Sequence, residues 1–316
     1  MAASEGRFPF VSVVVPHLNQ PAFLARCLRS LEAQDYPRDR FEIIVADNGS
    51  VEVTARSLRR LTGIRIVTEP KPGPGCARNA GVAVAAGTVL AFVDADCTAH
   101  PRWLSAAVER LRRGDCDVVG GDVRIAVGDP ERLTDLEAYE SVFAYRQQEY
   151  IEKQGFSGTG NLAMGRETFD RVGPFGGIEV AEDRDWGQRA AALGLRTAYC
   201  PDMVVYHPAR RSYAEIFAKW RRHTVHDFNR HREAGRSRLT WLARALAVLA
   251  SPPAHAVRIV RSDRLDGAGA RLRAAKALLT IRVYRAWYMA RVAFAADGEG
   301  RPLWNRAEPG TPVPSR

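Results

Sequence analysis

The sequence has no long apolar run and few cysteines. No stretch reaches about 18 apolar residues without a charge, the minimum for a helix that crosses a bilayer, so we expect no membrane span. The five cysteines show neither CxxC nor Cys/His spacing, which argues against a zinc site and a disulfide framework and favours a reducing compartment. The opening stretch MAASEGRFPF lacks a basic region followed by an apolar run, so we expect no signal peptide.

Negative charge is scarce in the last third of the chain. Residues 210–316 carry 22 Lys and Arg against 8 Asp and Glu, whereas residues 1–209 carry 24 against 28. The net charge of +10 therefore arises in the C-terminal part, as is typical of contact with an anionic surface, either phospholipid or nucleic acid. With 46% hydrophobic and 26% charged residues, the rest of the composition leaves room for one large core and an appendage.

Polar residues follow three predicted strands at the points where the strands end. FVSVVV (10–15), FEIIVA (41–46) and TVLAFV (88–93) are rich in apolar and β-branched residues, and they are followed by PHLN, DNGS and DAD. Apolar spacing between the strands predicts helices, so the order is β-α-β. We therefore expect an α/β fold with a mostly parallel sheet flanked by helices, in which all three strand ends lie along one ligand-binding edge.

Asp94 and Asp96 directly follow the central strand. In an extended chain, residues two apart point the same way, so both carboxylates could face one hard divalent cation. The open positions of such a cation suit the oxygens of a diphosphate. A solvated acidic turn is the alternative, because DxD arises by chance in many proteins.

Further along, the pattern predicts a strand at 116–127, one helix over 133–152 and a helix over 181–193. In the last helix, Asp183 shares the inward face with apolar residues, Glu182 lies beside it, and Asp185 points outward, where it can pair with Arg189. The dipole at a helix N-terminus also favours acidic residues, so the pattern by itself leaves a purely structural role open.

The segments VSVVVPHLNQPAFLARCLRSLEAQDYP, EIIVADNGS and GPGCARNAGVAVAAGTVLAFVDADC, in this order, resemble the family 2 glycosyltransferases. The resemblance implies a GT-A fold, with a catalytic domain over residues 9–210, and leaves a basic amphipathic helical region over 211–316 on the membrane or acceptor side. It also implies an inverting enzyme that moves one sugar from a nucleotide diphosphate sugar to an acceptor hydroxyl, in surface glycan or glycolipid biosynthesis.

The resemblance assigns four residues to the nucleotide. It places Pro16 and Asn19 in the nucleotide site and makes Asp47 a contact of the base. The base is usually uracil, so a UDP-sugar is the favoured donor, although a guanine N1–H could donate to the same carboxylate. Arg78 lies near the nucleotide, where its guanidinium could meet Asp47 or a phosphate.

The resemblance also assigns the chemistry. Asp94 and Asp96 become ligands of Mn²⁺ or Mg²⁺, and His207 is the third ligand in some relatives, with a plain surface histidine as the alternative. Asp183 becomes the general base that takes the proton of the acceptor, and Glu182 supports it or orients the acceptor. A single displacement inverts the anomeric centre, so no covalent nucleophile is required.

The basic helices at 211–295 favour peripheral contact with the cytoplasmic face of a membrane, or with a glycan or lipid-linked acceptor, because Trp, Tyr and Arg alternate there with aliphatic residues. A helical cap packed on the catalytic domain is the alternative, and no nucleic-acid partner is expected.

Two other functions stay open. A sugar nucleotidyltransferase normally carries a Gly-rich turn with a basic residue after the first strand, and the PHLNQP found there in this chain argues against that function. A non-catalytic nucleotide-sugar or membrane-binding protein would keep its function when Asp183 is replaced by Asn.

Overall fold

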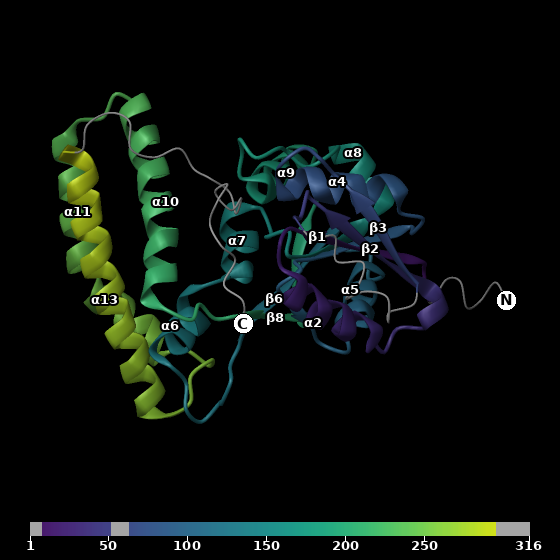
Figure 1. Ribbon diagram of the computed structural model, residues 1–316, viewed down its shortest axis with the longest axis horizontal. Coiled ribbons are helices and arrows are strands. Elements are labelled where there is room, and N and C mark those ends of the chain that lie inside the picture. The colour runs from purple at the N-terminus through teal and green to yellow at the C-terminus, as the bar shows by residue number, and fades with distance from the viewer. Residues whose placement is uncertain (1–7, 52–62, 295–316) are drawn as a thin grey trace. The chain divides into compact units, whose positions relative to one another are not determined.

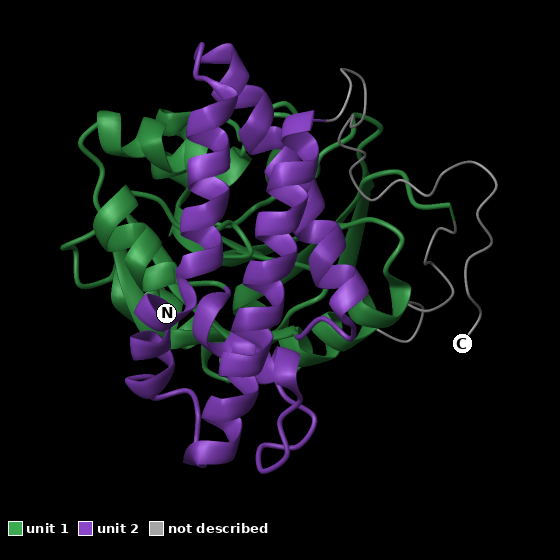
Figure 2. Cartoon of the chain, turned by 90° about the vertical axis from the view of Figure 1, so that its left-hand side faces the viewer, with its two compact units in different colours: residues 1–124, 145–208 green, residues 125–144, 209–316 purple. Residues whose placement is uncertain are grey.

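The computed structural model describes residues 8–51 and 63–294 and is shown in Figure 1. The chain forms two compact units, one from residues 1–124 and 145–208 and the other from residues 125–144 and 209–316 (Figure 2). The first unit ends at residue 208, and residues 125–144 belong to the second unit.

The first unit is built on an eight-stranded sheet with the order β3-β2-β1-β4-β7-β6-β8-β5. The strands are β1 (Val11–His17), β2 (Phe41–Asp47), β3 (Ile64–Thr68), β4 (Val89–Val93), β5 (Thr98–Ala99), β6 (Val118–Ala126), β7 (Asn161–Gly165) and β8 (Thr197–Pro208). β3, β2, β1 and β4 pair in parallel, whereas β7 is antiparallel to β4 and β6, and β5 is antiparallel to β8. The expected α/β fold is confirmed, and the first four strands of the chain all pair in parallel.

Helices cover both faces of this sheet. They are α2 (Pro21–Glu32), α4 (Pro74–Val84), α5 (Trp103–Leu111), α7 (Gln147–Gln154), α8 (Arg166–Val172) and α9 (Glu182–Ala192), with a 3-10 helix at Arg38–Arg40. Val13 and Val15 pack in one core with α2 and α5, whereas Val14 packs in a second core with α4, α8 and α9. Because side chains alternate between the two faces and both faces are buried, β1 reads as a continuous apolar run.

The single helix expected over 133–152 is two helices. α6 (Asp135–Phe143) starts at a capping box, and the chain then breaks at Tyr145, whose φ of 47° lies in the left-handed region that a non-glycine residue rarely adopts. α7 follows the break. The helical periodicity continues across this point, so the sequence pattern conceals a break that sends α6 into one unit and α7 into the other.

The second unit is helical throughout the part that the structure describes. Besides α6, its helices are α10 (Tyr213–Glu233), α11 (Arg238–Ala250), α12 (Pro252–Val260) and α13 (Gly267–Phe294). The long helix α13 packs against α6, α10, α11 and α12. Its core-facing residues are mostly alanine, which allows close packing. Within residues 8–51 and 63–294, no helix has both the length and the apolar character that a membrane span requires.

Candidate active site

The three polar strand ends meet at one edge of the sheet. β1 pairs in parallel with β2, with His17 opposite Asp47, and β1 pairs in parallel with β4 on its other side. Parallel neighbours end at the same edge, so the residues that follow these strands lie next to one another. The sequence-based expectation for this edge therefore describes the structure correctly.

Asp47 is buried and its carboxylate accepts hydrogen bonds from several directions. Ser50 donates its hydroxyl to Oδ1 (2.5 Å) and its N–H to Oδ2 (3.1 Å), and His17 Nδ1 lies 3.1 Å from Oδ1. The N–H of Gln20 donates to His17 Nε2, so Nδ1 of the neutral ring carries the proton that faces Asp47. Burial raises the pKa of Asp47, but the hydrogen bonds from Ser50 and His17 bring it below its ordinary value. Asp47 is thus held as a carboxylate, in part by a histidine that the sequence reasoning missed.

The turn after β1 is tied to the turn after β2. Asn19 has a positive φ of 54°, and its N–H donates to Ser50 Oγ (2.9 Å), while Pro16 lies within β1 itself. Asn48 donates its side-chain amide to two carbonyls of the loop at 69–73 and accepts from an N–H of the same loop. The loops around the expected nucleotide residues are therefore joined by side-chain to backbone hydrogen bonds.

Arg78 joins two acidic segments that are far apart in the sequence. It comes from α4 and its side chain is only 3% exposed. Nη2 donates to Asp94 Oδ1 (2.6 Å), and Nη1 donates to Glu182 Oε1 (3.1 Å). The contact with Asp47 that we considered is therefore replaced by these two. One fixed, planar guanidinium orients a carboxylate at the end of β4 and another at the start of α9.

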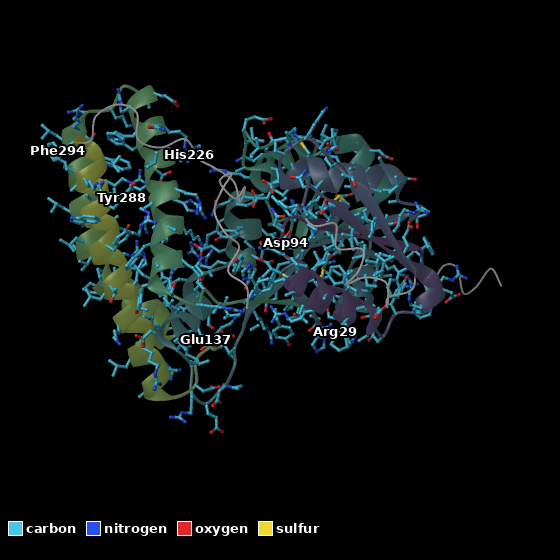
Figure 3. All side chains as sticks on the ribbon, in the orientation of Figure 1. Arg29, Asp94, Glu137, His226, Tyr288 and Phe294 are labelled. Atoms are coloured by element: carbon cyan, nitrogen blue, oxygen red, sulfur yellow. The ribbon has the colours of Figure 1, made fainter. Side chains whose placement is uncertain are left out.

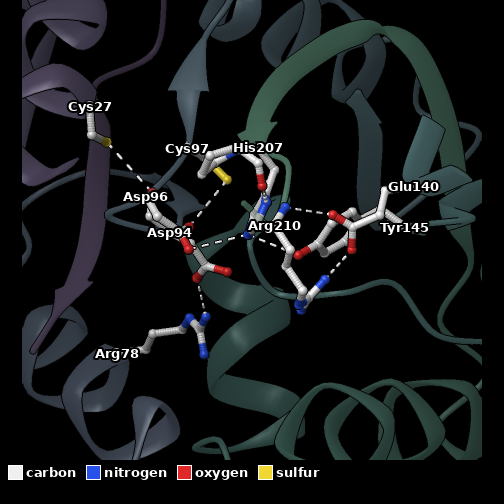
Figure 4. Close-up of polar contacts among 10 residues, drawn as sticks. Cys27, Arg78, Asp94, Asp96, Cys97, Glu140, Tyr145, His207 and Arg210 are labelled. Carbon is white, nitrogen blue, oxygen red and sulfur yellow. Dashed lines mark hydrogen bonds and ion pairs between the residues drawn. The ribbon is translucent and has the colours of Figure 1, made fainter. Parts of the chain in front are cut away.

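Asp94 and Asp96 contact different neighbours. The chain turns sharply after β4, because the N–H of Cys97 donates to the carbonyl of Asp94 (3.0 Å). Asp94 consequently faces Arg78, whereas Asp96 Oδ2 lies 3.2 Å from Nε2 of His207 (Figure 4). The extended geometry that we assumed for this pair is wrong, and each carboxylate has its own cationic or imidazole neighbour.

β8 brings His207 to Asp96. His207 Nδ1 donates to the carbonyl of Pro208 (2.7 Å), since a carbonyl oxygen can only accept, and Nε2 faces Asp96 and the hydroxyl of Tyr145 (2.8 Å). Burial lowers the pKa of His207, but the hydrogen bond and the charge of Asp96 raise it above its ordinary value. The sequence analysis predicts no role for Tyr145, because this residue lies inside the helix expected over 133–152.

The side chains present suit a divalent cation in part. Among residues 8–51 and 63–294, no group of three or more His, Cys, Asp and Glu side chains is arranged to hold a metal ion. Asp96 and His207 nevertheless offer an oxygen and a nitrogen donor 3.2 Å apart, a combination that suits Mn²⁺. Asp94 is held by Arg78, and Gly160 leaves it space, because a Cβ at Gly160 would lie 2.4 Å from Asp94 Oδ2.

The acidic start of α9 contains the expected base. Glu182 is fixed by Arg78, and Asp183 is partly buried directly after it. Burial raises the pKa of Asp183, and the negative charge of Glu182 raises it further, which makes its carboxylate a better proton acceptor than an exposed one. Asp185 pairs instead with Arg189 (3.0 Å), as the helical spacing predicted.

Known proteins share this architecture. The model of Glycosyl transferase family 2 matches residues 12–174. Glycosyltransferase AglE of Haloferax volcanii is 31% identical over 217 residues, which cover 67% of this chain and 70% of AglE, and an uncharacterized glycosyltransferase of Nostoc sp. is 28% identical over 56% of each chain. Among solved structures, the mannosyltransferase PcManGT of Pyrobaculum calidifontis, in complex with GDP-Man and Mn²⁺, has a TM-score of 0.54 at 23% identity, over 90% of this chain and 84% of PcManGT. This last similarity concerns the fold.

Proposed function

Because the chain belongs to glycosyl transferase family 2, we propose that it is an inverting, metal-dependent enzyme that transfers one sugar from a nucleotide diphosphate sugar to an acceptor hydroxyl. The glycosyltransferase activity and the GT-A fold follow from the family and from the fold similarity. What we propose beyond this is the nucleotide diphosphate sugar as the donor, the dependence on a metal and the inversion of the anomeric centre. Surface glycan or glycolipid synthesis is the setting that it implies.

The observation that carries this proposal is the double contact of Arg78. It fixes the carboxylate at the end of β4 and the carboxylate of Glu182 on one guanidinium, so the ligand-binding edge of the sheet and the acidic start of α9 lie together. Asp183 follows Glu182 directly. A group that can remove a proton is thereby held near the place where the donor would bind.

The chemistry needs one base and no covalent intermediate. The Asp183 carboxylate takes the proton of the acceptor hydroxyl while the acceptor oxygen bonds to the anomeric carbon, and the bond from that carbon to the diphosphate oxygen breaks with its electron pair. Glu182, held by Arg78, raises the pKa of Asp183 and so increases its basicity. Asp96 and His207, with Asp94 as a further ligand, would hold Mn²⁺ or Mg²⁺, which stabilises the negative charge of the leaving diphosphate when bound.

The nucleotide would lie over the ends of β1 and β2. Asp47, kept ionised by Ser50 and His17, can accept the imide N–H of uracil, and Pro16 and Asn19 lie in the adjoining strand and turn. A guanine N1–H could donate to the same carboxylate, and GDP-Man is the donor bound to PcManGT. We therefore place a UDP-sugar first and a GDP-sugar second.

We extend the proposal to the helical unit, which we expect to contact an anionic membrane peripherally at the cytoplasmic face. α13 exposes an apolar stripe on the side opposite its alanine-rich core face: Leu272, Leu279, Val283, Trp287 and Phe294. Further exposed aliphatic residues lie on α11 and α12: Leu239, Leu246, Leu249, Val257 and Val260. Figure 3 shows Phe294 at the end of α13.

The charge of these helices also favours membrane contact through this surface. The three helices α11, α12 and α13 contain no Asp or Glu, whereas each contains arginine. An exposed apolar stripe among basic side chains is the pattern of a helix that lies in the interface of an anionic bilayer. A packed cap would instead bury this stripe.

Calorimetric titration tests the donor and the metal together. UDP and GDP are titrated with and without Mn²⁺ into the wild type, the double variant Asp94→Asn/Asp96→Asn, and the control Asp170→Asn, which alters an exposed carboxylate on α8. We expect one nucleotide to bind only with Mn²⁺, and the double variant alone to lose this binding. If neither nucleotide binds, or if the affinity is the same with and without Mn²⁺ and in the double variant, the proposal is wrong and a non-catalytic binding role is favoured.

A further inference from the structure

Tyr145 combines an unfavourable backbone with a position beside the candidate metal ligands. In the described part of the chain, Asn19 is the other non-glycine residue with a positive φ. An aromatic residue seldom adopts this conformation unless its surroundings enforce it. The residue lies between α6 and α7, where the chain passes from the second unit back to the first.

The side chain of Tyr145 contacts that of His207. The two rings lie 4.5 Å apart between centroids with 38° between their planes, and the Tyr145 hydroxyl is 2.8 Å from Nε2 (Figure 4). Since Nδ1 donates to the Pro208 carbonyl, Nε2 of the neutral imidazole carries its only remaining lone pair. In this neutral tautomer, the Tyr145 hydroxyl is the neighbour that can donate to that lone pair, because the Asp96 carboxylate beside it can only accept.

We propose that Tyr145 is a positioning residue that holds the His207 ring through its own ring and competes through its hydroxyl with a divalent cation for Nε2. The inference rests on the proposed metal site at Asp96 and His207. One lone pair cannot serve an O–H donor and a cation together, so a cation that binds Nε2 displaces the hydroxyl.

This competition has a functional consequence. Metal affinity without nucleotide is reduced by the strength of one hydrogen bond, whereas a donor diphosphate adds ligands that offset the loss. We therefore expect the cation to bind firmly only together with the donor. The ring contact acts in the opposite direction, because it keeps the imidazole oriented toward Asp96.

Two substitutions separate the hydroxyl from the ring. Tyr145→Phe keeps the ring and removes the donor, so Mn²⁺ binding without nucleotide becomes about fivefold tighter, which corresponds to about 1 kcal/mol. Tyr145→Gly removes both groups at a residue where glycine adopts the observed φ without strain, and we expect it to bind Mn²⁺ more weakly than Tyr145→Phe. The loss of the free Mn²⁺ signal in electron paramagnetic resonance measures both affinities.

The control Tyr150→Phe makes the same chemical change on α7, where Tyr150 stacks on Phe156. If wild type binds Mn²⁺, Asp96→Asn loses it, and Tyr145→Phe matches wild type, the competition is refuted and the proposed function stands. If Asp96→Asn binds Mn²⁺ as well as wild type does, the metal part of the proposed function fails. If wild type and Tyr145→Phe both ignore Mn²⁺ even with UDP or GDP present, both proposals fail.

Discussion

The two units of this chain differ in whether their charged side chains are paired within the unit. In the unit with the sheet, three carboxylates of the candidate site meet a partner from another segment: Asp94 meets Arg78, Asp96 meets His207, and Asp47 meets His17. In the other unit, α11, α12 and α13 carry arginines and no acidic residue. In the proposed function, the first arrangement fixes charges for chemistry, and the second presents charge to an external anion.

The comparison extends to one buried ion pair in each unit. Arg78 is the buried member in the first unit, and Glu140, 2% exposed, is the buried member in the second, where it accepts from the N–H and the guanidinium of Arg210. The same interaction therefore serves a candidate site in one unit and helix packing in the other. The experiments below test this contrast.

Loss of the base should have the largest effect. Asp183→Asn should lower kcat about a thousandfold, because a general base contributes about 10²–10⁴ in rate, while leaving nucleotide binding intact. Sugar transfer and calorimetry measure the two effects. Asp185→Asn is the control, since it breaks only the outward pair with Arg189. A fully active Asp183→Asn enzyme would exclude this residue as the base.

Arg78→Met should reduce both stability and nucleotide binding. It leaves Asp94 and Glu182 without their common cation, which costs about 2–3 kcal/mol of unfolding free energy, below the range for fully buried pairs because Asp94 is 40% exposed. Urea unfolding measures the stability. Unchanged nucleotide affinity would show that this pair, like the one in the helical unit, is only structural.

Glu140→Gln should reduce stability alone. An amide in place of the buried carboxylate weakens two hydrogen bonds from Arg210, at a cost of about 2 kcal/mol. We expect the nucleotide affinity to equal that of wild type. Glu131→Gln, at an exposed position of the same unit, is the control. A loss of nucleotide binding in Glu140→Gln would break the contrast between the units.

Charge on the apolar stripe should weaken membrane binding. Val283→Glu/Trp287→Glu should bind vesicles of anionic phospholipid about tenfold more weakly in flotation assays, because exposed apolar area and positive charge both favour the interface. Leu193→Glu, an exposed apolar position of the other unit, should bind as wild type does. Equal binding by all three proteins would show that this stripe does not contact membrane.

The pH dependence should show the smallest change. Asp183 accepts a proton only when it is ionised, so the acid limb of kcat/KM follows its pKa, which burial and the charge of Glu182 raise above the ordinary value of 3.8. Glu182→Gln removes that charge and should move the limb to lower pH. A shift to higher pH would contradict the assignment of Asp183 as the titrating base.

The sequence by itself determined the elements and the edge at which the site lies. α2 buries Leu24, Cys27, Leu28 and Leu31, the apolar stripe that its spacing indicates, and Asp185 pairs with Arg189 four residues away. Such features depend on neighbours within a few residues, which periodicity records. The ordered motifs also identified the family, and parallel strands place their ends together by geometry alone.

Only the tertiary structure decided which groups meet at that edge. The contact of Tyr145 with His207 and the double contact of Arg78 both join segments far apart in the chain. No local pattern encodes them, because the energy of a buried ion pair or a strained φ is compensated by distant partners. The sequence determines which reactive side chains are present, and contacts between distant segments determine which groups they pair with.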